Sequence, residues 1–388
     1  MKVQCLLKMT NKKCRACGAE FFDKPLLIYE NSPESAQNFI EDLSSTKDAP
    51  VKLEIYQCSK CGLIQHNLKP VSYYKKVIRA VSFSNEMTTF RLNQLDTWLE
   101  KYRLKNKSIL EVGSGKGEYL NIFKQLGVKK IYGLEFDEKN IEHILLNGNS
   151  ATQGYLEHGL EYIKGQPFDA FAIFSFMEHW PNLKLGVETL NKFLKPDAYG
   201  LIEVPNFDMI KEKGLYTEFT VDHIFYFDQK SLSNFLTSNG FEILSIKNIW
   251  NDYIISAEVI RRKPLNIQVF DDKYIFIKKS LKDYLDQYKT TKIIIWGAGH
   301  QALTVISLAN IKKNIDYIVD SAIFKQNKFT PESHLLINEP DFMLKDKPET
   351  IIVMAAGFSN EIVKTINIKY PFIKNIAVLR EDYLEIVK

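Results

Sequence analysis

Four of the five cysteines in the 388-residue chain form two pairs whose spacing suits metal binding. Cys14 and Cys17 form one Cys-x-x-Cys motif, Cys58 and Cys61 form the second, and a glycine follows each motif. Two thiolates from one tight turn can reach the same ion, and four such ligands favour tetrahedral zinc. Because four protein thiolates leave no open coordination position, we expect this zinc to be structural. Two alternatives are a pair of thioredoxin-like redox centres, although such centres lie inside a βαβ unit, and an accidental spacing of buried cysteines.

A glycine-rich turn after a buried strand could bind a nucleotide-like ligand. Residues 108–112, Ser-Ile-Leu-Glu-Val, predict the strand, and Gly-Ser-Gly-Lys-Gly follows at 113–117, before a helix-forming segment begins at Glu118. Glycines allow the backbone to approach a ligand closely, and the start of a helix presents free N–H groups to it. A second predicted strand, 130–134, leads into Glu135, where a carboxylate can accept hydrogen bonds from both hydroxyls of an adenosine ribose.

The spacing of this turn favours S-adenosylmethionine (SAM) over a dinucleotide. A dinucleotide fingerprint needs Gly-x-Gly-x-x-Gly, whereas this turn is Gly-x-Gly-x-Gly and follows Glu111, which could hold the amino-acid part of SAM. A glycine turn without any ligand is the simpler alternative. Ligands of open α/β sheets bind beyond the carboxyl ends of the strands, so the end of the apolar strand that begins at Phe168 belongs to the same site. The expected SAM ligands are Glu111, Gly113, Ser114, Gly115, Gly117, Glu135, Phe136, Ser175 and Phe176.

Two alternations of strands and helices supply the elements that must position these residues. The first runs from Ser108 to about Arg262 and predicts an α/β domain with a mainly parallel, Rossmann-like sheet. The second begins at Lys292 and predicts another Rossmann-like domain. Turn-rich stretches separate the cysteine pairs, and apolar residues at near-helical spacing follow them. We therefore expect a zinc module at 1–70, a helical bridge at 71–103, a SAM domain at 104–262 and a C-terminal domain at 263–388.

Composition narrows the class of protein. The chain is 45% apolar and 25% charged, as globular proteins are, and its net charge of +4 is too small to indicate a nucleic-acid-binding protein of this length. No apolar run approaches the roughly 18–20 residues of a membrane span. Lys8 interrupts the N-terminus before the apolar core of a secretory signal could form. We expect a cytoplasmic protein, monomeric or weakly self-associating, without nucleic-acid or membrane partners.

Several motifs together resemble a known family. The turn at 113–117, Glu135, the segment Phe-Ser-Phe-Met-Glu-His-Trp at 174–180 and the strand Leu-Ile-Glu-Val-Pro-Asn at 201–206 resemble class I SAM-dependent methyltransferases. With the two cysteine pairs before them and Trp-Gly-Ala-Gly-His-Gln-Ala at 296–302 after them, nearly the whole chain resembles the three-domain sugar C-methyltransferases. The resemblance implies a nucleotide-activated keto-deoxysugar as substrate, and a C-terminal domain that helps to close the sugar site without holding a dinucleotide.

Methyl transfer to carbon needs a base that removes a proton beside a carbonyl and a group that holds the enolate. His223, flanked by an acid and aromatic residues, is the candidate base, and a core histidine bonded to a backbone carbonyl is the simpler alternative. The family's Tyr-x-Glu-His pattern places its histidine on His223, its glutamate on Asp222 and its tyrosine on Thr220. Because threonine is shorter, the enolate contact is expected from Tyr216, His179 or a bound water. The expected catalytic residues are therefore His223, Asp222, His179 and Tyr216.

A nucleotide sugar also contains a diphosphate, which cations could bind, and a nucleobase, which aromatic rings could bind. Tyr74 offers an aromatic ring, and Lys75 and Arg79 share one face at helical spacing. We expect these three residues, together with Glu178 near the cleft, to contact the substrate. A solvated basic helix face explains the same charge spacing equally well.

The sequence alone is also compatible with other functions. Gly-Ala-Gly-His-Gln-Ala at 297–302, followed by an acid at Asp320, fits a dinucleotide fingerprint better than the first turn does, which would suit an NAD-dependent oxidoreductase. A zinc-dependent interaction module would leave two ligand-binding turns unexplained. Within the methyltransferases, His223 could instead deprotonate an O–H or N–H group for O- or N-methylation.

Overall fold

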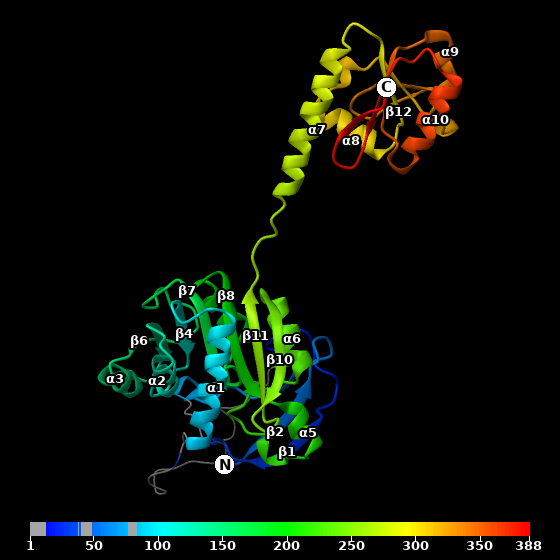
Figure 1. Cartoon of the computed structure of the whole chain (residues 1–388). Helices are drawn as coiled ribbons and strands as arrows, with labels where there is room; N and C mark the ends of the chain where they lie inside the picture. The colour runs from blue at the N-terminus through cyan, green and yellow to red at the C-terminus, as the bar shows by residue number, and fades with distance from the viewer. Residues whose placement is uncertain (1–12, 38, 40–48, 77–83) are drawn as a thin grey trace. The chain divides into compact units, whose positions relative to one another are not determined.

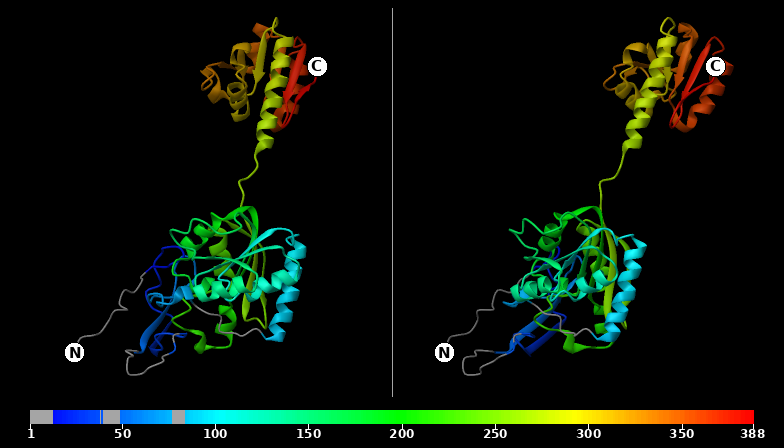
Figure 2. Two further views of the ribbon diagram at one scale, coloured as in Figure 1. Left: turned by 90° about the vertical axis from the view of Figure 1, so that its left-hand side faces the viewer. Right: turned by 60° about the vertical axis from the view of Figure 1, so that its left-hand side comes forward.

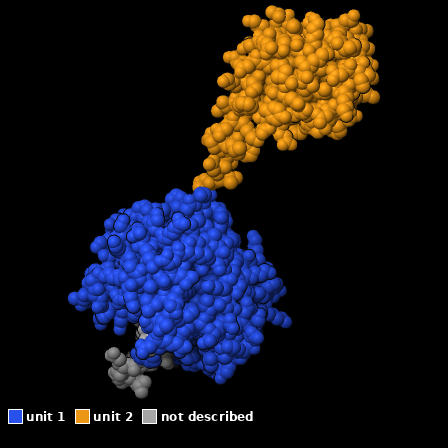
Figure 3. Space-filling view, in the orientation of Figure 1, with its two compact units in different colours: residues 1–263 blue, residues 264–388 orange. Residues whose placement is uncertain are grey.

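The chain is described here by a computed structural model that covers residues 13–37, 39, 49–76 and 84–388. Its contacts divide into two units, residues 1–263 and 264–388 (Figure 3). The cysteine pairs and the first glycine turn belong to unit 1, and the Gly-x-Gly-x-x-Ala turn belongs to unit 2. Over the described residues, no helix has the length and apolar character needed to cross a membrane.

Unit 1 is built around a seven-stranded sheet in the order β10-β11-β8-β7-β4-β5-β6 (Figure 1). Its strands are β4 Ser108–Val112, β5 Lys130–Glu135, β6 Ser150–Gln153, β7 Phe168–Phe174, β8 Leu194–Pro205, β10 Phe241–Ile249 and β11 Ile254–Arg261. Strands β4 to β8 are parallel, whereas β11 runs antiparallel to both β8 and β10. The mainly parallel α/β sheet predicted from the sequence is confirmed.

Helices cover both faces of this sheet because its strands carry apolar residues on both sides. Leu110 and Val112 pack into one core with α4 and α6, whereas Ile109 packs into a second core with α1, α2 and α3. The helices of unit 1 are α1 Asn85–Lys101, α2 Glu118–Gln125, α3 Glu138–Leu146, α4 Leu183–Asn191, α5 Phe207–Glu212 and α6 Gln229–Ser238. The parallel strands therefore end at one edge, where the glycine turn and the acid must lie.

A smaller antiparallel sheet joins the N-terminal segment to a distant part of the chain. Its order is β1-β2-β3-β9, and its N-terminal strands, blue in Figures 1 and 2, lie beside the larger sheet. Ile64 pairs with Tyr226, and Gln65 pairs with Phe225. The segment that follows the cysteines is thereby bonded to the segment that carries His223. The strands are β1 Leu27–Ser32, β2 Val51–Gln57, β3 Ile64–His66 and β9 Phe225–Tyr226.

Unit 2 is a second α/β unit, with the sheet order β14-β15-β13-β12-β16-β17-β18. Its central strands β15, β13, β12, β16 and β17 are parallel, and β14 and β18 are antiparallel edge strands. The strands are β12 Ile293–Trp296, β13 Tyr317–Val319, β14 Lys328–Phe329, β15 Leu336–Asn338, β16 Thr350–Val353, β17 Asn375–Leu379 and β18 Leu384–Ile386. The helices are α7 Gln268–Gln287, α8 His300–Ala309, α9 Met343–Asp346 and α10 Ser359–Lys369. The second Rossmann-like fold predicted from the sequence is confirmed.

A buried ion pair fastens α1 to the large sheet. Arg91 of α1 is 2% exposed, Glu203 of β8 is fully buried, and the Arg91 Nη1 lies 2.5 Å from the Glu203 Oε2. Gln94 and Ser256 also donate hydrogen bonds to the Glu203 carboxylate. Both charged groups are buried, so each needs the opposite charge of the other to offset its loss of hydration.

We predict that Arg91→Met lowers the free energy of unfolding of unit 1 by about 3–5 kcal/mol, because it leaves the Glu203 carboxylate buried without its charge partner. Urea denaturation would measure this in a chain carrying Trp296→Phe, so that tryptophan fluorescence reports on unit 1 alone. The double variant Arg91→Met, Glu203→Leu should recover much of the loss. A single variant as stable as the parent chain would contradict the prediction.

Candidate active site

The glycine turn and Glu135 meet at the carboxyl edge of the large sheet. Gly113 and Gly115 have φ values of +73° and +54°, in the left-handed region that favours glycine. The Glu135 carboxylate, which is 8% exposed, accepts a hydrogen bond from the Gly115 N–H at 2.8 Å. Its other oxygen accepts bonds from the Phe136 and Asp137 N–H groups at 3.0 and 2.9 Å. Burial raises the pKa of Glu135, while these N–H groups oppose the shift and hold the carboxylate in place.

An apolar pocket lies beside this acid. It is lined by Val112, Gly113, Leu134, Glu135, Phe136, Gly154, Tyr155, Leu156 and Phe176. A Cβ placed on Gly113 would lie 2.5 Å from the Phe176 ring, so only glycine lets the turn and the ring come this close. The pocket combines an apolar wall with a carboxylate, as the adenosine part of SAM requires.

The other predicted SAM ligands surround the same edge. Glu111 is fully buried within β4, and Ser114 is buried against β5, where a Cβ on Gly133 would meet the Ser114 hydroxyl at 2.5 Å. Gly117 precedes α2 with a φ of +86°. Ser175, which follows β7, has a φ of +46°, an uncommon backbone conformation for a residue with a side chain and one that is found at functional sites. The residues present therefore fit SAM.

Two imidazoles and a carboxyl group lie together where β7 ends. Glu178 and His179, in the short 3-10 helix η2 (Met177–His179), are 1% and 5% exposed. The His179 Nδ1 lies 2.8 Å from the Asp222 carbonyl oxygen, which can only accept, so Nδ1 carries the proton and Nε2 keeps its lone pair. The His223 ring lies edge-on to the His179 ring, with centroids 4.8 Å apart. The Ile224 N–H donates to the Glu178 carbonyl oxygen at 3.0 Å and ties the two segments together.

Burial controls the charge of these three side chains. It lowers the pKa of His179 to about 4, and burial together with the neighbouring His179 lowers the pKa of His223 to about 3. Burial also raises the pKa of Glu178 to about 8. At neutral pH both imidazoles are therefore uncharged, and His223 has a lone pair that can accept a proton.

The Asp222 carboxylate is hydrogen-bonded to the N-terminal part of the chain. Its Oδ1 accepts hydrogen bonds from the Tyr73 hydroxyl at 2.7 Å and from the Ala36 N–H at 3.1 Å. The sequence pointed to Tyr74 and missed Tyr73, because the partner that distinguishes these adjacent tyrosines lies 149 residues further along the chain. Thr220 is engaged locally, since its hydroxyl accepts a bond from the His223 N–H at 3.4 Å.

Tyr216 is not grouped with the two histidines. Its side chain is 69% exposed and lines a separate apolar pocket between the small sheet and α5, together with Leu27, Phe207 and Phe219. The His179 Nδ1 proton is already bonded to a carbonyl, so neutral His179 has no proton at Nε2 to donate to an enolate.

The predicted substrate arm lies beside the adenosine pocket. Tyr74 packs edge-on against Tyr155, with centroids 5.5 Å apart, and Lys75 Nζ lies 4.9 Å from the centre of the Phe136 ring. Lys75 also forms an ion pair with Glu157, which offsets its charge. Arg79 lies outside the described residues. The structure thus places Tyr74 and Lys75 against residues that line the cofactor pocket.

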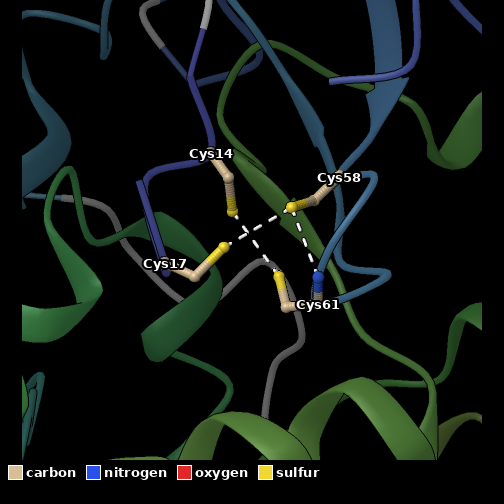
Figure 4. A group of neighbouring side chains, drawn as sticks. All are labelled: Cys14, Cys17, Cys58 and Cys61. Atoms are coloured by element: carbon tan, nitrogen blue, oxygen red, sulfur yellow. Dashed lines mark hydrogen bonds between the residues drawn. The ribbon is translucent and has the colours of Figure 1, made fainter. Parts of the chain in front are cut away.

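The four paired cysteines converge on one point (Figure 4). The Cys14 and Cys61 sulfurs are 3.7 Å apart, and the Cys17 and Cys58 sulfurs are 3.5 Å apart. A regular tetrahedron with zinc–sulfur bonds of about 2.3 Å would separate the sulfurs by about 3.8 Å. N–H groups of Ala16 and of the Gln65 side chain donate to the Cys14 sulfur at 3.4 and 3.1 Å, which favours a thiolate there. The donor set and spacing fit a tetrahedral metal ion.

Comparisons with known proteins agree with this architecture. Residues 87–246 match a family model described as a methyltransferase domain, and residues 261–370 match one described as a C-methyltransferase C-terminal domain. The C-methyltransferase NovU of Streptomyces niveus is 18% identical over 395 residues, which cover 90% of this chain and 91% of that protein.

Two solved methyltransferase structures are similar to part of this chain. The plantazolicin methyltransferase BpumL, in complex with SAH, is 17% identical, with a TM-score of 0.38 over 50% of this chain and 88% of that one. The magnesium protoporphyrin IX methyltransferase ChlM of Synechocystis PCC 6803, with bound SAH, is 14% identical, with a TM-score of 0.37 over 48% of this chain and 90% of that one.

The sheet and its glycine turn define unit 1 as a class I SAM-dependent methyltransferase fold. Unit 2 carries the companion C-terminal domain that the second family model describes. The chain is a SAM-dependent methyltransferase that combines a methyltransferase domain with a C-methyltransferase C-terminal domain, and over most of its length it is similar to a C-methyltransferase. The enzyme class predicted from the sequence is confirmed.

We predict that Gly113→Ala lowers the affinity for SAM about tenfold to a hundredfold, because the added Cβ displaces the Phe176 ring from the pocket wall and strains a left-handed backbone. Isothermal titration with SAM would measure the loss. Gly127→Ala is the matched control, since Gly127 has a φ of +88° but no atom lies near its added Cβ. Equal losses of SAM affinity in the two variants would contradict the prediction.

Proposed function

We propose that this enzyme methylates a carbon atom of a keto-deoxysugar carried on a nucleoside diphosphate, and that His223 is the base. The observation that supports this most directly is the uncharged His223 imidazole beside His179, at the sheet edge that also holds the SAM pocket. The match of unit 2 to a C-methyltransferase C-terminal domain supports carbon as the methyl acceptor. The nucleotide sugar is taken from the family resemblance of the sequence.

The chemistry divides between the chain and its cosubstrate. SAM, when bound, supplies an electrophilic methyl group. His223 accepts the proton from the carbon beside the carbonyl, and the electron pair of that C–H bond passes into the enolate. The enolate carbon then forms its bond to the methyl group as the methyl–sulfur bond breaks, and His223 releases its proton to solvent. Asp222, held by Tyr73, fixes the backbone that carries the imidazole and does not touch the ring nitrogen.

Unit 2 is proposed to help close the sugar site without binding a dinucleotide. Asp320, where a dinucleotide would need a carboxylate for its ribose, already accepts hydrogen bonds from the Ala298 and Ala322 N–H groups at 2.7 and 2.8 Å. Lys325 Nζ lies 2.9 Å from the same carboxylate and neutralises it. Because backbone N–H groups bond to Glu135 in the same way, it is the ion pair with Lys325 that disfavours the NAD-dependent alternative. A zinc ion in the cysteine cluster needs reduced thiols, which supports a cytoplasmic location.

Deuterium exchange tests the base. With a nucleoside-diphosphate keto-deoxyhexose in deuterium oxide and no SAM, the enzyme should incorporate deuterium at the carbon beside the carbonyl. His223→Asn should slow this exchange by about 10²–10⁴-fold, while His143→Asn, on the exposed surface of α3, should leave it unchanged. Mass spectrometry would follow the exchange. Methylated product without any exchange that depends on His223 would favour O- or N-methylation instead.

Metal analysis tests the structural zinc that we propose for the cysteine cluster. The purified chain should contain one zinc ion, and Cys17→Ser should lose it and unfold at lower urea concentration, because three thiolates hold the ion less tightly. Lys60→Ala, a change at an exposed position in the other Cys-x-x-Cys motif, should keep the zinc. Elemental analysis by mass spectrometry gives the metal content. A fully zinc-loaded Cys17→Ser protein would overturn the assignment.

A further inference from the structure

The histidine cluster has the composition of a second metal site. One carboxylate oxygen of Glu178 and one ring nitrogen each of His179 and His223 all lie within 4.8 Å of one another. Two imidazoles and one carboxylate are a set of donors that binds first-row transition metals and leaves coordination positions open. Oxygen-preferring ions such as magnesium suit this set less well, because two of its three donors are nitrogen.

One of the two histidines, His179, is hydrogen-bonded as metal ligands usually are. The Nδ1–H of His179 is committed to the Asp222 carbonyl at 2.8 Å, which fixes the tautomer and leaves the Nε2 lone pair for an ion. Such a backbone acceptor behind the ring is the usual partner of a metal-bound histidine. His223 is held by the same segment, since its backbone N–H bonds to Thr220 and its neighbour Ile224 bonds to the Glu178 carbonyl.

The third donor is a buried carboxyl group in need of a partner. Glu178 is 1% exposed, and its Oε2 is buried without a hydrogen-bond partner among the described residues. Leaving such a group unpaired costs free energy, which a cation between the three side chains would remove. This oxygen is an observation independent of the histidine spacing, and it points to a ligand within the cluster.

We propose that Glu178, His179 and His223 bind one divalent transition-metal ion, separate from the cysteine site, and that this ion inhibits the enzyme. The inhibition rests on the proposed function, because an ion bound to His223 takes the lone pair that proton abstraction needs. Metal-bound and base-competent states of His223 are therefore mutually exclusive. Zinc, cobalt and nickel ions suit the two nitrogen donors and one oxygen donor.

Cobalt titration of the full chain tests the site without relying on activity. Protein already carrying one zinc ion in its cysteine cluster is titrated with cobalt chloride and followed by absorption spectroscopy. Cobalt held by nitrogen and oxygen shows visible d–d bands without the near-ultraviolet charge-transfer bands of cobalt thiolates. Glu178→Gln and His223→Ala should each weaken this binding by at least about tenfold, whereas His143→Ala should not.

Two kinds of outcome separate this proposal from the proposed function. Visible bands that are identical in the parent, Glu178→Gln and His223→Ala proteins, or thiolate bands alone, would overturn the metal site. Circular dichroism shows whether each variant is folded. If Glu178→Gln is not folded, His223→Ala still tests the site, because His223 is partly exposed. Cobalt should also slow deuterium exchange in the parent enzyme, and undiminished exchange with the site filled would overturn the inhibition. A parent enzyme without any exchange would overturn the proposed base while leaving the cobalt spectrum as the readout of the site.

Discussion

The pairing of two very short strands holds the active-site segment in position. β9 contains only Phe225 and Tyr226, and it pairs with Ile64 and Gln65 of β3. The His66 N–H also donates to the Ile224 carbonyl at 3.1 Å, and the His66 ring bonds to the Val221 carbonyl at 3.1 Å. The backbone on both sides of His223 is therefore bonded to the N-terminal sheet.

The cysteine cluster is linked through this strand pairing to the segment that carries His223. Cys58 and Cys61 immediately precede β3, and Gln65 of β3 donates to the Cys14 sulfur at 3.1 Å. A metal ion held by the four sulfurs would fix β3, and β3 in turn holds β9. A small sheet of this kind buries too little apolar surface to be stable alone, and the packing of α5 against the strands adds to its core. The zinc ion and the base that we propose would therefore depend on the same small sheet.

The SAM pocket and the histidine cluster share β7 as their support. Phe176 lines the pocket, and Glu178 and His179 follow in the next turn, so the SAM pocket and two of the three residues of the histidine cluster are positioned from the same strand end. Burial disfavours the charged form at both places. Backbone N–H groups oppose this effect at the Glu135 carboxylate, whereas at His179 and His223 burial outweighs the favourable contribution of Asp222, and both imidazoles stay neutral. A neutral imidazole suits either a base or a metal ligand.

The sequence alone determined those features that depend on neighbouring residues. The Cys-x-x-Cys spacing, the glycine turn and the acid at the end of β5 are local patterns, because a turn, a helix start and a strand end are set by a few adjacent side chains and φ values. Only the tertiary structure decided which distant groups meet. The bond from Tyr73 to Asp222 and the approach of His223 to Glu178 and His179 join segments tens of residues or more apart. The placement of Tyr216 in a separate pocket likewise depends on how the small sheet packs against α5. Local periodicity carries no information about such pairs, since their contacts depend on how sheets and loops pack after the elements have formed.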